Sequence, residues 1–567
     1  MLNSAHELRT RLSGWASRAA LVGEDGVAVT YGELLEAGAR FVAGFGQARR
    51  LVFIEASNRP EALAAYFACL VAGHPVYLFG EKDDAALPAL IERYRPNRVI
   101  YPLADDPVRV LHDEVLDMHP ELAVLLSTSG STGSPKFVKL SFGNIASNAL
   151  SIAEYLRIAG DDRAMTSLQF NYSYGLSVVN SHLFTGASLL LSDASVTEER
   201  FWRAFRTHGA TSFAGVPYTF ELLEKMGPAW AETPGLRTVT QAGGALSPAR
   251  IEQIARLADA NNWRFYVMYG QTECAPRIAY LPPEMAASHA RCIGVAIPGG
   301  ALEIVDEAGN VVLEPDVAGE LVYRGPNVML GYAADAAGLA GGDPPGPHRT
   351  GDVACRTSDG LFYITGRLSR FVKPFGLRVN LDELQEKLWH DYPEAVCTGN
   401  DQTIVVALPG EGGARNEAVV AGLSSMLKLP AASFRVVNPS VIPRLANGKV
   451  DFRSILDAAN GDQPRSGPGA ALGLLFSRRF VHQVIEELAM ILGVKSAHWH
   501  GIGHIYATVL NLPRVGDDAT FVDLAGDSLS YVQVTVALEE YLGKLPANWE
   551  TRTVGDLEQE AASASSI

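Results

Sequence analysis

Cysteine is scarce in this sequence. The 567 residues include only five cysteines, an odd number, and none of them forms a Cys-x-x-Cys pair. Small secreted domains rely on many paired cysteines, and common zinc sites use closely spaced ones. The sequence therefore indicates neither a disulfide framework nor a cysteine-rich zinc site. We expect reduced cysteines in the protein interior at Cys69, Cys274, Cys292, Cys355 and Cys397.

Long apolar runs are also missing. No run reaches about eighteen apolar residues, the length that a membrane-spanning helix needs. The first residues, Met-Leu-Asn-Ser-Ala-His-Glu, lack the basic segment and the following apolar segment of a secretory leader. We therefore expect a cytoplasmic protein with no membrane partner.

Basic residues are too few to balance the acidic ones. The chain has 47 Lys and Arg against 63 Asp and Glu, which gives a formal net charge of −16. Nucleic acids and anionic membranes attract cationic surfaces, so neither is expected as a partner. Any phosphate that the protein binds must lie in a local pocket.

Alternating strand and helix signals fill the first part of the chain. Its length predicts about three or four domains. An apolar strand at 51–54 is followed by a helix that starts at Pro60 and ends near Gly73, and then by a strand at 75–78. This order is typical of an α/β domain with a parallel sheet. Similar signals predict strands at 187–191 and 210–216 and helices at 219–225 and 248–260.

The later part of the chain changes character three times. The alternating residue pattern after position 301 is typical of antiparallel strands. Residues 366–457 then show both strand and helix signals. Glycine, proline and polar residues from 458 to 473 are typical of a linker, after which a helix is predicted at 480–492. Residues 496–567 hold three basic and ten acidic residues, and three minus ten gives a local charge of −7. We expect a small acidic helical domain there.

A hydroxyl-rich segment between two predicted strands is the first chemical signal. Apolar residues 122–126 predict a buried strand, and a second strand begins after Lys136. The Walker phosphate loop is excluded, because it needs a glycine before its lysine and a helix after it, whereas Lys136 follows Pro135. Small residues and hydroxyls leave backbone N–H groups open to a phosphate, although an ordinary Gly/Ser turn has the same composition. The candidate phosphate ligands are Thr128, Ser129, Gly130, Ser131, Thr132, Gly133 and Lys136.

Four further motifs follow in a fixed order: Tyr-Gly-Gln-Thr-Glu at 269–273, Arg-Thr-Gly-Asp at 349–352, Gly-Arg at 366–367, and Pro-Arg-Leu-Ala-Asn-Gly-Lys at 443–449. With these motifs, residues 10–457 resemble the adenylate-forming superfamily of acyl-CoA synthetases, peptide-synthetase adenylation domains and luciferases. Near the carboxyl end, Gly-Asp-Ser-Leu at 526–529 resembles the site where an acyl or peptidyl carrier protein bears 4′-phosphopantetheine. The chain therefore resembles an adenylation and thiolation didomain.

The resemblance implies a mixed α/β multidomain fold. Residues 1–366 would form the large adenylation subdomain and 367–457 the small mobile one. A linker at 458–495 would lead to an all-α, four-helix carrier domain at 496–567. In the family the small domain swings about a hinge between half-reactions, and the matching position is Ser369.

The resemblance also implies the roles of individual residues in binding ATP and Mg²⁺. Glu273 would hold Mg²⁺ and Thr272 would contact the α-phosphate, while Lys449 would neutralise charge between that phosphate and the acid. Gly376 would line the approach of the thiol, and Ser528 would carry 4′-phosphopantetheine. The adenine site would comprise Gly243, Gly244, Ala245, Tyr269 and Gly270, and the ribose would contact Asp352 and Arg367.

The pocket for the acid is predicted at Asn171, Tyr172, Tyr174 and Gly175. Adenylation domains for α-amino acids normally have Asp at the position of Asn171, where it pairs with the substrate ammonium. A neutral amide cannot replace that charge, and burying an unpaired ammonium costs several kcal/mol. We therefore expect an aryl, fatty or other acid without an α-ammonium. Gly175 is expected to leave part of the pocket open, and core packing is the alternative role for Tyr172 and Tyr174.

The sequence thus predicts an AMP-forming acid–thiol ligase that loads its own carrier domain. The expected partners are a small-molecule carboxylic acid, a phosphopantetheinyl transferase, and a downstream enzyme or module that accepts the acyl group. Three alternatives remain: an amino-acid-loading peptide-synthetase module, an acyl-CoA ligase, and a catalytically inactive scaffold with a carrier.

Overall fold

The computed structural model divides the chain into two compact units at Phe371 and Val372. This division falls a few residues after the boundary predicted at 366. The structure describes residues 4–80, 86–127, 136–344, 346–372, 374, 379–389, 391–410, 412–427, 429–444, 450–460, 501–510, 512, 514–521, 524, 534, 537–538, 541–542, 549 and 552–564.

A nine-stranded sheet forms one layer of the first unit, with strand order β15-β14-β13-β12-β11-β9-β10-β1-β2. Its central strands are parallel, and helices α7, α8 and α9 connect four of them in sequence. This arrangement confirms the α/β pattern that the sequence predicts. The strands are β1 (Ala19–Val22), β2 (Ala28–Thr30), β9 (Arg163–Met165), β10 (Ser188–Leu190), β11 (Ser212–Gly215), β12 (Thr238–Gln241), β13 (Arg264–Gly270), β14 (Arg277–Leu281) and β15 (Val295–Ala296); the helices are α7 (Glu199–Thr207), α8 (Pro217–Lys225) and α9 (Pro248–Asn261).

A seven-stranded sheet forms another layer, with strand order β18-β8-β7-β4-β3-β5-β6. Four of its strands are parallel, and the predicted hairpin is the antiparallel pair β7 and β8. Its strands are β3 (Val52–Glu55), β4 (Val76–Phe79), β5 (Arg98–Ile100), β6 (Val108–Val110), β7 (Leu122–Ser127), β8 (Phe137–Ser141) and β18 (Tyr332–Ala333); the associated helices are α1 (Ala5–Ser13), α2 (Tyr31–Val42), α3 (Pro60–Val71), α4 (Leu87–Tyr94), α5 (Phe142–Leu156) and α6 (Ser173–Leu183).

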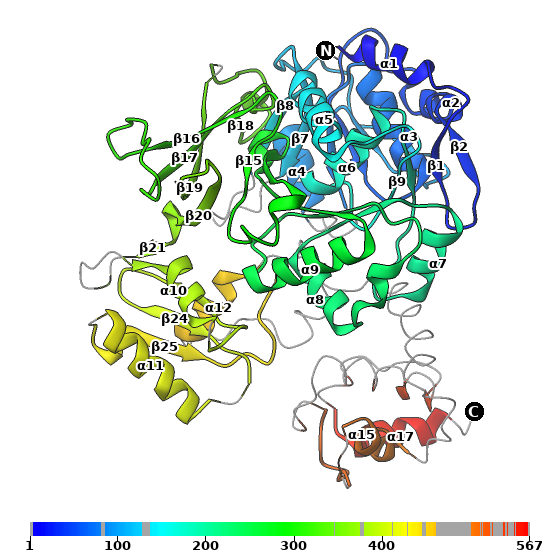
Figure 1. Ribbon diagram of the computed structural model, residues 1–567. Helices are drawn as coiled ribbons and strands as arrows, with labels where there is room; N and C mark the ends of the chain where they lie inside the picture. The colour runs from blue at the N-terminus through cyan, green and yellow to red at the C-terminus, as the bar shows by residue number, and fades with distance from the viewer. Residues whose placement is uncertain are drawn as a thin grey trace. The chain divides into compact units, whose positions relative to one another are not determined.

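The core of the first unit lies where helices α3, α5 and α6 meet both sheets (Figure 1). One apolar cluster contains Leu189 from the nine-stranded sheet and Val124 from the seven-stranded sheet, together with Leu63, Ile145 and Leu176 from these helices. Burial of such side chains is the main favourable term in folding. The packing of this apolar cluster holds α5 and α6 against the strands of both sheets.

A third, antiparallel sheet follows in the order β16-β17-β19-β20, as the alternation after residue 301 predicts. It carries the Arg-Thr-Gly-Asp and Gly-Arg motifs on adjacent strands. Its strands are β16 (Ala301–Val305), β17 (Gly319–Arg324), β19 (His348–Arg356) and β20 (Phe362–Arg367).

The second unit contains a three-stranded sheet, in which β23 and β24 are antiparallel and β24 and β25 are parallel, and β22 and α10 precede this sheet in the chain. Further along the chain, Tyr506, Phe521 and Trp549 belong to an apolar cluster of the carboxyl-terminal part. The helix predicted at 480–492 lies outside the described residues. The elements are β21 (Phe371–Val372), β22 (Val379–Asn380), α10 (Leu381–Leu388), β23 (Val396–Gly399), β24 (Ile404–Ala407), α11 (Ala414–Leu427), β25 (Phe434–Val437), α12 (Phe452–Asn460), α15 (Ile502–Val509) and α17 (Val554–Ala564).

Among the helices of the described part of the chain, none combines the length and the apolar character needed to cross a bilayer.

Candidate active site

One buried carboxylate lies at the centre of the candidate site. Asp352 on β19 is the register partner of Arg367 on β20, and only 2% of its side chain is exposed. The Arg367 Nε lies 2.9 Å from Asp352 Oδ1. Buried carboxylates are stable only when charges and donors compensate them. The pairing of two adjacent strands supplies that compensation.

The second oxygen of Asp352 receives two more donors from β13 and the loop after it. The Tyr269 hydroxyl and the Gln271 amide both donate to Oδ2, the latter at 3.0 Å. Gln271 also donates to the Thr350 carbonyl at 2.9 Å, and His348 Nε2 lies 2.9 Å from Gln271 Oε1. Burial, reinforced by the neighbouring carboxylate, raises the pKa of Tyr269 well above its ordinary value, so this phenol stays a donor.

The sequence predicted three members of this cluster: Tyr269, Asp352 and Arg367. It missed the contribution of Gln271, although Gln271 lies inside a motif that identified its neighbours. His348 had no sequence signal of its own, because it becomes relevant only through its contact with Gln271.

Thr272 and Glu273 follow β13 in a short 3-10 helix, η3 (Thr272–Cys274). The Glu273 carboxylate accepts a hydrogen bond of 2.8 Å from Tyr332, and its backbone carbonyl accepts one from the Met329 N–H. Thr272 Oγ1 lies 3.4 Å from Ser173 Oγ at the start of α6. The two predicted phosphate-site residues therefore lie next to the helix that begins the predicted acid pocket.

Glu273 is compatible with Mg²⁺. Its side chain is only partly buried, and Tyr332 occupies one of its two oxygens. Mg²⁺ commonly takes one or two carboxylates together with substrate phosphates rather than a complete protein cage. In the described part of the chain, no cluster of three or more His, Cys, Asp or Glu side chains could hold a metal.

The phosphate hairpin is positioned by the β7 and β8 pair. Ser127 and Phe137 are register partners at the end of the pair that the connecting segment joins, and Lys136 is exposed immediately before β8. The other predicted phosphate ligands, at 128–133, lie outside the described residues. So do Gly376, Lys449 and Ser528, while Ser369 falls in the 3-10 helix η6 (Leu368–Arg370).

The predicted adenine turn and the predicted acid pocket are contiguous. Gly243 adopts a φ of +89°, and a Cβ atom there would lie 3.1 Å from the Tyr172 hydroxyl. Gln241 fixes the turn by donating to the Gly244 carbonyl at 2.8 Å, and Ala245 is exposed beside it. Both the conformation and the close approach favour glycine at position 243.

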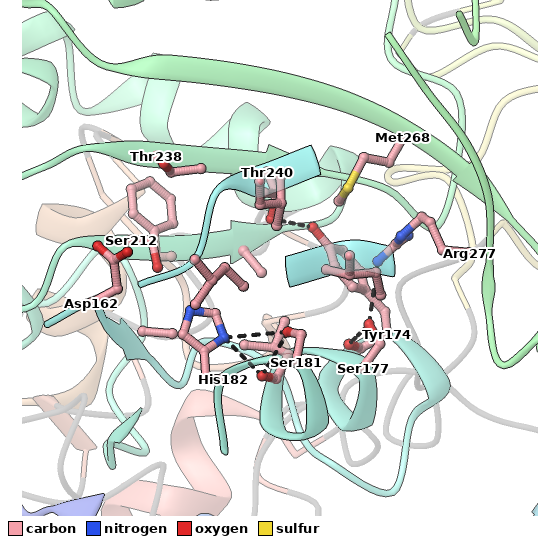
Figure 2. Close-up of a pocket in the computed structure, with 17 residues that line it drawn as sticks. Asp162, Tyr174, Ser177, Ser181, His182, Ser212, Thr238, Thr240, Met268 and Arg277 are labelled. Atoms are coloured by element: carbon pink, nitrogen blue, oxygen red, sulfur yellow. Dashed lines mark hydrogen bonds between the residues drawn. The ribbon is translucent and has the colours of Figure 1, made fainter. Parts of the chain in front are cut away.

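Tyr174 is a buried wall of a pocket beside α6 (Figure 2). Only 2% of the residue is exposed, and its hydroxyl lies 2.7 Å from Thr240 Oγ1 on β12. Burial raises the pKa of Tyr174 to about 12, which keeps it neutral. Asn171 is partly buried just before α6, next to Tyr172.

The role expected for Gly175 is wrong. A Cβ atom at this position would lie 2.1 Å from the Gln169 carbonyl oxygen and close to Leu168. The missing side chain therefore allows the chain to turn tightly into α6, and it does not open the pocket. Glycine is required here by a backbone contact.

Gly175→Ala is expected to lower the free energy of unfolding of the first unit by about 1–3 kcal/mol, because the backbone must move to admit the methyl group. Gly143→Ala is the matched control, since Gly143 also lies near the start of a helix and a Cβ there would meet only Ser141 Oγ at 3.5 Å. That change should be neutral or raise stability by up to about 1 kcal/mol. Urea unfolding measures the free energy of unfolding of both variants. An equal change in the two would contradict the proposed backbone contact at Gly175.

Comparisons with known proteins match two families to this chain. The AMP-binding enzyme family matches residues 82–333, and the phosphopantetheine attachment site family matches residues 501–560. One similar protein is the non-ribosomal peptide synthetase CmlP of Streptomyces venezuelae, which is 25% identical over 456 residues (78% of this chain, 42% of the relative). Another is the dimodular nonribosomal peptide synthase of Bacillus subtilis, which is 30% identical over 451 residues (74% of this chain, 18% of the relative). The chain thus spans less than half the length of these two relatives.

A solved structure shows the same fold. The o-succinylbenzoate CoA synthetase MenE from Bacillus subtilis, in complex with its acyl-adenylate intermediate, has a TM-score of 0.65 and 21% identity, covering 81% of this chain and 98% of that chain. The fold, the order of the two matched families and the peptide-synthetase relatives agree with one another. This chain is therefore an adenylation–carrier didomain, an AMP-binding enzyme domain followed by a phosphopantetheine attachment domain.

Proposed function

We propose that this protein activates a carboxylic acid with ATP to give an acyl adenylate and pyrophosphate, and then transfers the acyl group to its own carrier domain. The observation that carries the proposal is the presence, in one chain, of the AMP-binding domain and the phosphopantetheine attachment domain. The first supplies an activated acid and the second a site for a thiol. Phosphopantetheine on Ser528 would supply the thiol nucleophile for the second half-reaction.

The nucleotide is proposed to bind around the Asp352 cluster. Asp352, held by Arg367 and Tyr269, would accept hydrogen bonds from the ribose hydroxyls, and the turn at 243–245 would flank the adenine together with Tyr269 and Gly270. Because the carboxylate is already fixed by donors from two strands, it needs little reorganisation when the nucleotide binds.

The phosphates are proposed to lie between η3 and the β7–β8 hairpin. Thr272 would donate to the α-phosphate, Glu273 would hold Mg²⁺, and the hydroxyls of residues 128–132 with Lys136 would bind the departing pyrophosphate. Lys449 would approach the α-phosphate and the acid as a mobile cation. Such cations stabilise the negative charge that gathers when the carboxylate attacks phosphorus.

The domain plan proposed here is a large subdomain at 1–366, a small mobile subdomain at 367–457 that moves about a hinge near Ser369, a linker at 458–495 and a four-helix carrier at 496–567. Gly376 would line the path of the thiol after this movement. A phosphopantetheinyl transferase and a downstream acyl-accepting enzyme or module are the proposed partners, and the cytoplasm is the proposed compartment.

The acid is proposed to lack an α-ammonium. Asn171 offers a neutral amide where a carboxylate would be needed, and Tyr172 and Tyr174 nearby are neutral phenols, because burial raises the pKa of both. Without a counter-charge, the cost of burying an ammonium is not repaid.

Acid-dependent exchange of pyrophosphate into ATP tests this function. We expect exchange with one class of acids that lack an α-ammonium and little with the common amino acids. A preference for amino acids would instead support an amino-acid-loading module. Rapid acyl transfer to free coenzyme A with no loading of the protein would support an acyl-CoA ligase. No exchange with any acid would favour an inactive scaffold.

A further inference from the structure

Arg277, the first residue of β14, is a buried cation with no carboxylate partner among the residues that the structure describes. Only 2% of the residue is exposed, and its Nε has no hydrogen-bond partner in the described part of the chain. Arginine remains charged in proteins, and buried charges are normally paired. This unpaired guanidinium points to a counter-charge that arrives with a ligand.

The groups around the guanidinium are neutral. Its Nη2 donates to the Ser177 hydroxyl at 3.3 Å, and its Cζ lies 4.7 Å from the centre of the Tyr174 ring (Figure 2). The Tyr155 hydroxyl also contacts it, and burial keeps that phenol protonated by raising its pKa. These contacts hold the side chain in place and leave its positive charge uncompensated.

A cavity adjoins Arg277. Tyr174, Ser177 and Thr240 are among its polar lining residues, and Ile152 and Met268 are among its apolar ones. Its volume of about 30 Å³, counted as space open to the centres of water-sized groups, exceeds the roughly 10–15 Å³ that one water needs. The two oxygens of one carboxylate fit this volume.

Asp162 lies at the other end of the cavity and does not neutralise Arg277. Its oxygens accept from the Thr211 hydroxyl at 3.0 Å, from the Ala159 N–H at 2.9 Å and from Arg237 at 3.1 Å. His182, which lines the same end, is held neutral because burial lowers its pKa. The free positive charge of the cavity is therefore at its Arg277 end.

Helix α6 connects this charge to the proposed reaction centre. Ser173, at the start of α6, lies 3.4 Å from Thr272, the proposed contact of the α-phosphate. Ser177 lies one turn further along the same helix, a rise of about 6 Å. An acid whose reacting carboxylate lies beside Thr272 would therefore place a group at Arg277 after a short carbon chain.

We propose that the substrate is a short dicarboxylic acid, whose first carboxylate is adenylated and whose second carboxylate binds Arg277 and Ser177 in the cavity beside Tyr174. This inference rests on the proposed function and adds the substrate class. Charge-assisted hydrogen bonds from a guanidinium to a carboxylate are strong and directional, and an ammonium would be repelled from the same position. The second carboxylate is bound and does not react.

Pyrophosphate exchange with the full-length protein tests the inference. Malonate, succinate and glutarate are compared with monocarboxylic acids of the same chain lengths. We expect kcat/KM for the preferred dicarboxylate to exceed that for its monocarboxylic counterpart by at least about 100-fold. Arg277→Gln should remove most of this difference, and Arg277→Lys should keep part of it.

Arg250→Gln is the matched control, because Arg250 is a partly exposed arginine of α9 in the same unit, paired with Glu224 at 2.7 Å. It should leave the ratio between the two acids unchanged. Equal or faster exchange with monocarboxylates in the wild-type protein would contradict the proposed binding of a second carboxylate at Arg277. An equal loss of exchange for both acids in Arg277→Gln would contradict it as well. Either result would leave the proposed acid activation intact. No exchange with any acid would overturn the proposed function and this inference together.

Discussion

Asp352→Asn is expected to lower kcat/KM for ATP in the pyrophosphate-exchange reaction by about 100-fold or more. Donors face both oxygens of Asp352: Arg367 faces one oxygen, and Tyr269 and Gln271 face the other. An asparagine must turn its amide NH₂ toward one of these sets, so a donor meets a donor. Arg367 is half exposed, so the larger cost comes from the mismatched donors at the buried oxygens. Leaving a buried polar group unsatisfied costs about 1–3 kcal/mol, and more at a charged group, and each 1.4 kcal/mol is a factor of ten. The proposed ribose acceptor is lost as well.

Glu303→Gln is the control for this experiment. Glu303 lies in the same antiparallel sheet and pairs with Arg324 at 3.2 Å, but that pair is exposed to solvent. Exposed ion pairs contribute about 0–1 kcal/mol, so its exchange kinetics should stay within about threefold of the wild type. Urea unfolding of both variants separates a loss of folded protein from a loss of ATP binding. A folded Asp352→Asn protein with unchanged KM for ATP would refute the nucleotide role of this carboxylate.

Most of the fold could be predicted because its signals are local. The apolar run 122–126 and the hydroxyl-rich turn predicted two strands joined by a hairpin, and β7 and β8 pair in this way. The helix expected from Pro60 is α3, in which the proline occupies the first turn where it needs no N–H partner. Long-range order is different, since the strand order of the nine-stranded sheet depends on packing that no single segment specifies.

Residues of the candidate site could be predicted from the sequence only where they lie inside a recognisable motif. Asp352 and Tyr269 lie in two motifs, but their hydrogen bond joins positions 83 residues apart. The resemblance to a family placed them in one site, whereas periodicity and composition did not. Arg277 shows the limit of this reasoning, because its lack of a carboxylate partner among the described residues is visible only from its neighbours in the three-dimensional structure.

Gly175 shows why a correct motif can carry a wrong interpretation. The absence of a side chain is compatible with open space and with a crowded backbone, and the sequence is the same in both cases. The Gln169 carbonyl fills the position of the missing Cβ. Only the path of the chain before α6 distinguishes the two roles, and that path is set by tertiary packing.

Ser528→Ala is expected to abolish acyl loading of the protein while leaving pyrophosphate exchange within about twofold of the wild type. The substitution removes one hydroxyl oxygen, which is the atom to which phosphopantetheine would be attached. The AMP-binding family match covers residues 82–333 and the attachment-site match covers 501–560, so the proposed adenylation site and the proposed thiol carrier lie in different parts of the chain. Removing the thiol carrier should therefore stop the second half-reaction only.

Intact-protein mass spectrometry measures this outcome after incubation with coenzyme A, a phosphopantetheinyl transferase, ATP and the preferred acid. Ser530→Ala is the matched control, because it removes a hydroxyl two residues away and should leave both the pantetheine and the acyl mass additions unchanged. Acylation that survives in Ser528→Ala would place the acceptor elsewhere. Loss of exchange together with loading would mean that the two domains do not work as separable halves. Loading of the wild-type protein that is lost in Ser528→Ala, with exchange retained in both proteins, distinguishes a carrier-loading ligase from an acyl-CoA ligase, because a ligase that used only free coenzyme A would load neither protein.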